Sequence, residues 1–145
     1  MMHYSNQDEI EAIILAFENC TLPRSQWTHP AHLTVALWYL IRHQKPVATR
    51  LICEGIQRYN TVMGILQTKQ SGYHETIALF WVEIVNRFLT EQSFNGSLLA
   101  QMNTLLQQYD DPALMFQYYS CDRLMSWEAR TTWLVPDLKL IESMI

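Results

Sequence analysis

The sequence of 145 residues has little charge, and its basic residues form no cluster. Only 17% of the residues are charged, and the formal net charge is −4. Because nucleic-acid binding usually requires a basic patch or stripe, we do not expect nucleic acid as a partner. With 49% hydrophobic residues, the chain can bury a core of ordinary size, so neither a disordered nor a fibrous protein fits. We expect a single domain over residues 1–145.

The sequence also lacks a long hydrophobic run and a cysteine framework. The longest apolar run, residues 33–41, is broken by Thr34 and falls far short of the ~20 residues of a membrane-spanning helix. The first residues lack the basic start of a secretory signal. Cys20, Cys53 and Cys121 are an odd number at wide spacing, which favours reduced thiols. We therefore expect a cytoplasmic protein without a membrane partner, and the oligomeric state is left open.

Glycine and proline are scarce, with four and five residues, and they mark the ends of expected helices. Apolar residues recur at helical spacing, and no segment shows convincing strand-like alternation. The expected helices lie within 5–20, from 28–30 to about 43, from 46 to about 60, from 73 to about 91, over 98–109, from 111–112 onward, and within 121–133. The second of these is apolar nearly all round, which is typical of a buried central helix. The sequence predicts an all-α bundle of six or seven short helices.

Three histidines stand near the starts of two of these helices. His29 and His32 are three residues apart, which places them on one helix face, ~4.5 Å apart along the axis. His74 begins the fourth expected helix. Short connections make consecutive helices antiparallel, so the second and fourth should run the same way and share one end. We therefore predict that the three imidazoles converge on one divalent metal ion.

The expected chemistry follows from the histidine ligands. Three histidines with a fourth position open to water are typical of a catalytic zinc or iron site, and manganese or nickel would also be possible ions. Glu75 points about 100° away from its neighbour His74, which suits a general base or a support for a ligand. The predicted activity is metal-assisted hydrolysis or water activation on a small molecule. The stronger HExxH pattern is absent, because Ala78 stands at its fifth position.

Other interpretations stay open at this point, including whether the protein is an enzyme at all. His29 could cap a helix, and His32 could be a hydrogen-bonded core histidine. The domain could then be a metal-free module that binds a small polar ligand, or a structural or interaction domain. Tyr73, Asn60 and Arg130 are candidate substrate-binding residues.

Arg130 and Asp137 are polar residues in an apolar, aromatic-rich C-terminal segment. They could bind an anionic substrate or pair with each other, and pairing is the favoured interpretation. A cysteine nucleophile is not favoured, because the thiols are scattered and none is next to a histidine in the sequence.

Two segments carry a resemblance to a known family. W-T-H-P-A-H-L at 27–33 and G-Y-H-E-T-I at 72–77 resemble an all-helical bacterial family without assigned function, which pairs an aromatic-x-H-x-x-H segment with YHET. Residues 118–120, 124–126, 128–130 and 135–138 are similar to its C-terminal pattern, and Ala78 departs from the threonine of that pattern. The resemblance implies a helical domain whose functional centre is formed by the two histidine segments. It implies no reaction or substrate.

Overall fold

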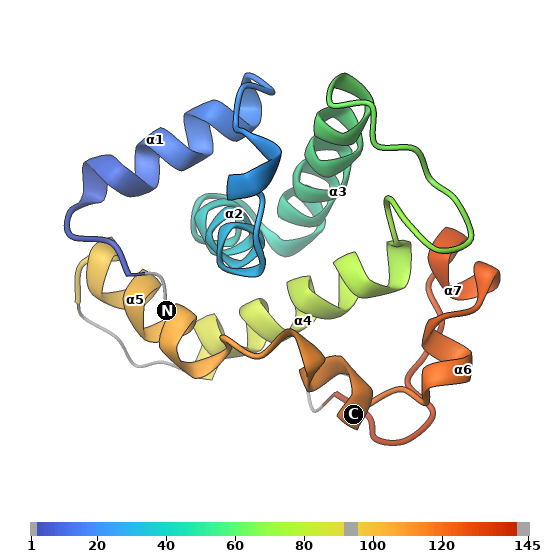
Figure 1. Ribbon diagram of the computed structural model, residues 1–145. Helices are drawn as coiled ribbons and strands as arrows, with labels where there is room; N and C mark the ends of the chain where they lie inside the picture. The colour runs from blue at the N-terminus through green and yellow to red at the C-terminus, as the bar shows by residue number, and fades with distance from the viewer. Residues whose placement is uncertain (1–2, 92–95, 142–145) are drawn as a thin grey trace.

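The computed structural model describes residues 3–91 and 96–141, and these residues are mostly helical (Figure 1). The α-helices are α1 (Gln7–Glu18), α2 (His29–Arg42), α3 (Lys45–Val62), α4 (Glu75–Glu91), α5 (Leu98–Gln108), α6 (Cys121–Leu124) and α7 (Trp127–Thr131). Two 3₁₀ helices, η1 (Arg24–Gln26) and η2 (Pro112–Gln117), join them. The described residues form no strand, so the predicted all-α fold of six or seven helices is confirmed.

Short polar side chains begin most of the helices. In each case the side chain accepts a hydrogen bond from a backbone N–H of the first turn, which satisfies one donor that the helix leaves unpaired. The capping residues are Asn6 for α1, Thr28 for α2, Ser97 for α5, Ser120 for α6 and Ser126 for α7. The sequence thus determines locally where these helices begin.

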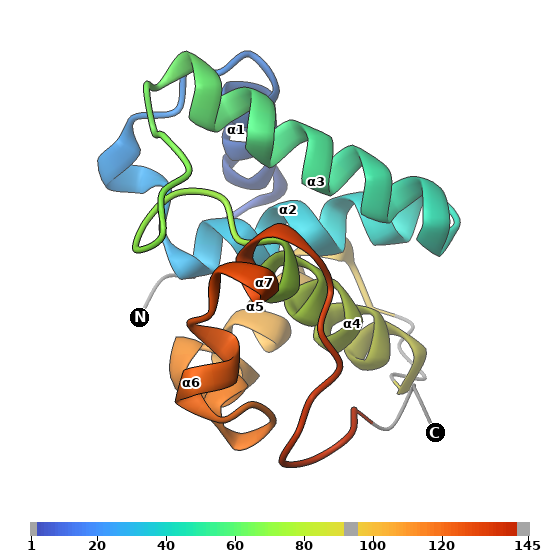
Figure 2. The same cartoon turned by 90° about the vertical axis from the view of Figure 1, so that its right-hand side faces the viewer.

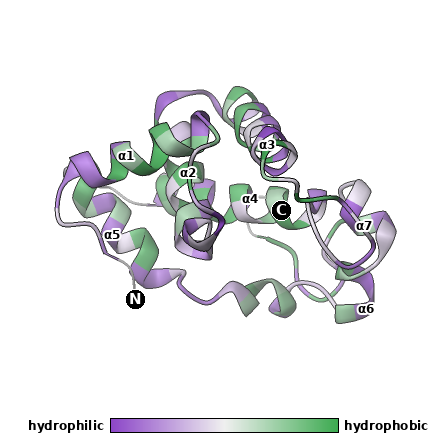
Figure 3. Ribbon diagram, turned by 45° about the horizontal axis from the view of Figure 1, so that its top comes forward, coloured by the Kyte–Doolittle hydropathy of each residue, from purple (hydrophilic) through white to green (hydrophobic). Residues whose placement is uncertain are grey.

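α2 is the central helix, as its all-round apolar sequence predicted. It packs against α1, α3, α4 and α5, and Figure 1 looks along its axis with those helices around it. Its buried residues extend over every face, from Ala31 and Leu33 to Tyr39 and Leu40. α3, by contrast, alternates apolar and polar residues along its length (Figure 3), as expected for a helix with one face on the surface.

The helices do not form the simple up-and-down arrangement that short connections predicted. α3 follows α2 closely and returns beside it (Figure 2), but residues 63–74 form a long connection before α4. α4 then crosses α2, because Figure 1 shows α2 end-on and α4 lengthwise. Even so, the N-termini of α2 and α4 lie at one cavity, which is described below.

The C-terminal part of the chain packs on the first half of α4. α7 contacts α4, and the buried Thr76 hydroxyl donates a hydrogen bond to the Thr132 carbonyl at 2.7 Å. The same hydroxyl accepts a hydrogen bond from the backbone N–H of Leu134 at 3.1 Å. These contacts hold α6 and α7 beside the start of α4. No helix among residues 3–91 and 96–141 combines the length and apolar character that crossing a bilayer requires.

Candidate functional site

A cavity of about 500 Å³ lies between α2, α3 and α4, with α7 and the connection before α4 along its sides. Its apolar lining includes Trp27, Ile56 and Trp81. The structure also brings together six of the seven residues that the sequence singled out. These six lining residues are His29, His32, Asn60, Tyr73, His74 and Arg130.

His29 is the first residue of α2, and one of its ring nitrogens is already bonded within the protein. Its Nε2 lies 2.8 Å from the carbonyl oxygen of Tyr109. Since a carbonyl only accepts, Nε2 carries the proton and donates, and Nδ1 keeps a lone pair. No hydrogen-bond partner for Nδ1 lies in the described part of the chain. The ring packs edge-on against Trp81, with centroids 4.5 Å apart, and burial lowers the pKa of His29.

His32 shows the same division between its two ring nitrogens. Nδ1 lies 2.7 Å from the Thr28 carbonyl and therefore donates to it, so Nε2 keeps a lone pair. The indole of Trp27 covers the ring, with centroids 3.7 Å apart. Although the residue keeps some solvent access through the cavity, these close neighbours desolvate the imidazole and lower the pKa of His32 to about 4. The ring is therefore neutral at neutral pH.

His74 differs, because both of its ring nitrogens are used within the fold. Nε2 donates to the Leu124 carbonyl at 2.7 Å, and Nδ1 accepts from the backbone N–H of Ile77 at 3.1 Å. His74 therefore caps α4 and ties it to α6. The side chain is buried, which lowers the pKa of the imidazole and favours its neutral form.

The predicted three-histidine metal centre is not assembled in this arrangement. Within residues 3–91 and 96–141, no three His, Cys, Asp or Glu side chains are grouped so that they could hold one ion. His74 also differs from a ligand in its bonding, because a ligand nitrogen must offer a free lone pair and the Nδ1 lone pair of His74 receives the Ile77 N–H. Metal binding by this protein stays a prediction.

Glu75, the predicted base, does not line the cavity. Its carboxylate accepts a hydrogen bond from the Tyr73 hydroxyl, and the Cys53 thiol lies next to that hydroxyl. Burial, followed by these two neighbours, raises the pKa of Tyr73, and burial raises the pKa of Cys53. The raised pKa values favour the protonated forms of the Tyr73 phenol and the Cys53 thiol. The catalytic role of Glu75 stays a prediction.

Arg130 and Asp137 do not pair with each other, so the favoured interpretation was wrong. Asp137 instead accepts hydrogen bonds from the backbone N–H and the hydroxyl of Ser120, at 2.8 and 2.6 Å. These bonds lower the pKa of Asp137. Arg130 points away toward the connection before α4, where its Nη1 donates to the Gly72 carbonyl at 3.0 Å. The two side chains therefore bind different parts of the chain, Asp137 the start of α6 and Arg130 the connection before α4.

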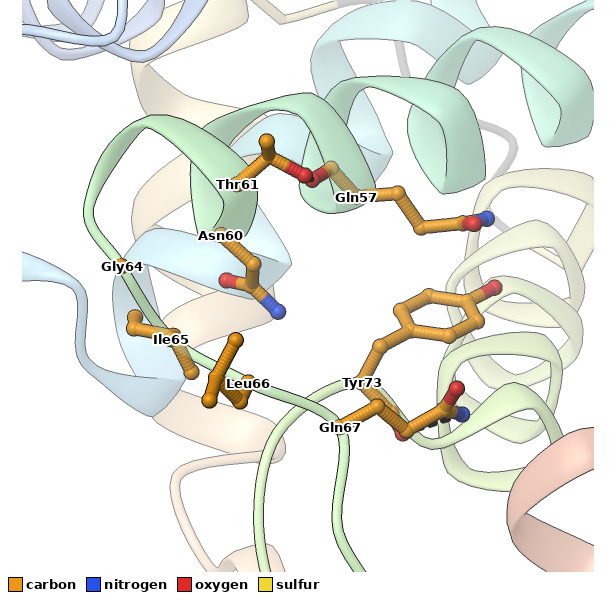
Figure 4. Close-up of a pocket in the computed structure, with 8 residues that line it drawn as sticks. All are labelled: Gln57, Asn60, Thr61, Gly64, Ile65, Leu66, Gln67 and Tyr73. Atoms are coloured by element: carbon orange, nitrogen blue, oxygen red, sulfur yellow. Dashed lines mark hydrogen bonds between the residues drawn. The ribbon is translucent and has the colours of Figure 1, made fainter.

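A second pocket of about 270 Å³ adjoins the first and shares Asn60, Ile65 and Tyr73 with it (Figure 4). In Figure 4, Asn60 on α3 and Tyr73 before α4 lie on opposite sides of this pocket. Asn60 is only 8% exposed, and its side-chain amide has no hydrogen-bond partner among the described residues. The amide is therefore available to a molecule in either pocket.

Sequence reasoning missed Gln67, which holds the wall between the two pockets. Its side-chain nitrogen donates to the carbonyls of Tyr73 and Arg130, at 3.1 and 3.4 Å. Gln67 lies in the long connection, which has no helical periodicity from which the position of a side chain could be predicted. The sequence therefore contains no signal for its role. Trp27 and Trp81, which the sequence analysis does not name as candidate site residues, also line the cavity.

Searches of protein-family models, curated proteins and solved structures found no match to this chain. The resemblance to a helical bacterial family therefore depends on the motif residues alone.

Proposed function

We propose that this protein binds a small organic molecule in the cavity between α2, α3 and α4, without a metal ion, in the bacterial cytoplasm. The carrying observation is a pair of neutral imidazoles, His29 and His32, which both line the cavity and each keep one ring nitrogen without a hydrogen-bond partner among the described residues. A lone pair accepts a hydrogen bond but cannot donate one. The ligand should therefore present N–H or O–H groups to the two histidines.

The rest of the lining supports the same proposal. Sites for small molecules are mostly apolar and aromatic, with a few convergent polar groups that fix orientation. Here Trp27 and Trp81 supply flat apolar surfaces beside the two imidazoles, and the Asn60 amide adds a donor and an acceptor. The volume of about 500 Å³ lies within the range of ordinary ligand pockets.

Filling the cavity tests the proposal. Ala78 lines the cavity from α4, whereas Ala16 on α1 does not, and both are half-buried. The probes are phenol, aniline and indole. Each is compared with the analogue in which methyl groups replace every N–H or O–H hydrogen, and binding is measured by ligand-observed NMR. The unmethylated probes should bind the wild type better, and Ala78→Phe should weaken their binding by more than about tenfold, or ~1.4 kcal/mol.

Ala16→Phe is the matched control, since it makes the same change away from the cavity, and it should bind the probes as the wild type does. Thermal melts of both variants establish that each is folded. Equal binding to the Ala78→Phe variant, or no binding to the wild type, would rule out this cavity as a ligand site.

Metal ions separate this proposal from the metal-dependent alternative. A ligand that binds only the folded state raises the free energy of unfolding, by about 2.7 kcal/mol at a hundredfold excess over its dissociation constant. The melting temperature rises with it. We expect no rise with Zn²⁺, Mn²⁺, Fe²⁺ or Ni²⁺, because His74 has no free lone pair. A rise in the wild type that disappears in His74→Ala would instead support the three-histidine centre.

A further inference from the structure

Arg130 brings a permanent positive charge to the wall of the cavity. The residue lies on α7, lines the cavity, and is only 6% exposed. An arginine side chain stays protonated at all physiological pH values, so burial cannot remove its charge. Burying a charge is costly unless an opposite charge and a full set of hydrogen bonds compensate it.

The protein supplies only part of that compensation. Nη1 donates to the Gly72 carbonyl at 3.0 Å and lies 3.5 Å from the Tyr73 carbonyl. Nε is buried, and it is the one buried side-chain nitrogen or oxygen of the described residues without a hydrogen-bond partner. Carbonyl dipoles carry partial charges, so the positive charge is only partly balanced.

No carboxylate of the described part of the chain pairs with Arg130. The ion pairs found there are Lys45–Glu83, Arg50–Glu54 and Arg87–Glu91. Two acidic groups described above have other partners, since Glu75 accepts from the Tyr73 hydroxyl and Asp137 accepts from Ser120. Within residues 3–91 and 96–141, the cavity therefore has a buried cation in its wall without a carboxylate partner.

We propose that the ligand carries an anionic oxygen group, a carboxylate or a phosphate, that binds beside Arg130. This inference rests on the proposed function, since it assigns a chemical class to the molecule in the same cavity. A planar guanidinium is suited to both anions, because its donors match their paired oxygens. The complete ligand is a small aromatic or apolar acid that also offers N–H or O–H groups to His29 and His32.

Matched acids and amides test the charge without changing the protein. The probes are benzoate, phenylacetate and naphthoate, each paired with its primary amide, and phenyl phosphate is compared with phenol. Affinity is measured by isothermal titration calorimetry or ligand-observed NMR at neutral pH. A hydrogen bond to a charged group should make each acid bind about 10- to 100-fold more tightly than its amide. The carboxylates and phenyl phosphate then show which anion the site prefers.

Substitution of Arg130 provides the second test. Arg130→Gln should lower the affinity for the acids to that for the amides and leave the amide affinity unchanged. Arg123→Gln is the control. Like Arg130, Arg123 donates to a backbone carbonyl, in its case that of Val135, but it does not line the cavity. Arg130→Lys should keep part of the preference, since it retains the charge without the planar group.

The outcomes separate this inference from the proposed function. Acids and amides that bind the wild type equally would overturn the anion site while the small-molecule cavity stands. Failure of every probe to bind would overturn both. If Arg130→Gln does not fold, the comparison of acids with amides on the wild type decides alone.

Discussion

The Gly72→Ala variant should lose roughly 2 to 5 kcal/mol of its free energy of unfolding, because two separate penalties meet at this residue. Its backbone has a φ of +83°, which L-residues with a side chain rarely adopt. An added Cβ would also lie 2.3 Å from the Leu66 carbonyl oxygen and 2.8 Å from the Gln67 Cα. Both atoms belong to backbone, so relief requires the whole connection before α4 to shift.

Gly64→Ala is the matched control for this prediction. Gly64 lies in the same connection with a φ of +71°, but its added Cβ would meet no atom within 4 Å. It should therefore show only the backbone penalty of about 1 to 2 kcal/mol. Urea unfolding of both variants gives the comparison. Equal losses for the two variants would mean that the close approach at Gly72 costs nothing.

The Gly72 variant should also weaken ligand binding. The Gly72 carbonyl accepts a hydrogen bond from Arg130, and Tyr73 and His74 follow it in the cavity wall. A displaced connection would move all three groups at once. The benzoate affinity of Gly72→Ala should therefore fall, whereas Gly64→Ala should keep it.

The protein should lose stability as the pH falls from about 6.5 to 4, because burial lowers the pKa values of His29, His32 and His74. In this range the unfolded chain takes up protons on these residues and the folded protein does not. The unfolded state then binds more protons, so the free energy of unfolding decreases with decreasing pH. With a folded pKa of about 4 against an ordinary 6.5, His32 alone accounts for a loss on the order of 2 to 3 kcal/mol.

Urea unfolding at several pH values between 7 and 4 measures this loss. An ordinary histidine, with a pKa of about 6.5, takes up its proton in the upper part of this range. His32→Gln should be less sensitive to acid than the wild type, because residue 32 can no longer take up a proton in either state. His43→Gln is the control, since His43 is exposed at the end of α2. A wild type as stable at pH 4 as at pH 7, or an unchanged acid loss in His32→Gln, would contradict the assignment.

The helices could be predicted because their signals are local. Apolar spacing identified α1, α2 and α4 in outline, and Thr28 and Pro30 marked the start of α2 within one or two residues. The directions of the helices could not be predicted in the same way. The long connection of residues 63–74 frees α4 from running beside α3, and side-chain packing then sets its crossing of α2.

The candidate site was predicted in composition but not in chemistry. Its two histidine segments were found from spacing, since a three-residue interval places His29 and His32 on one face. What His29 and His74 do depends on carbonyls far along the chain, those of Tyr109 for His29 and Leu124 for His74. Such partners leave no trace in the local pattern. The same holds for Arg130, whose carbonyl partners Gly72 and Tyr73 lie almost sixty residues earlier.

The central position of α2 couples the folding of the helices that pack around it. Because α2 is apolar nearly all round and packs against α1, α3, α4 and α5, removing any one of them would leave apolar surface of α2 in water. No fragment that contains α2 can therefore bury it without the others. Because α2, α3 and α4 also form walls of the cavity, those walls are formed together with the core.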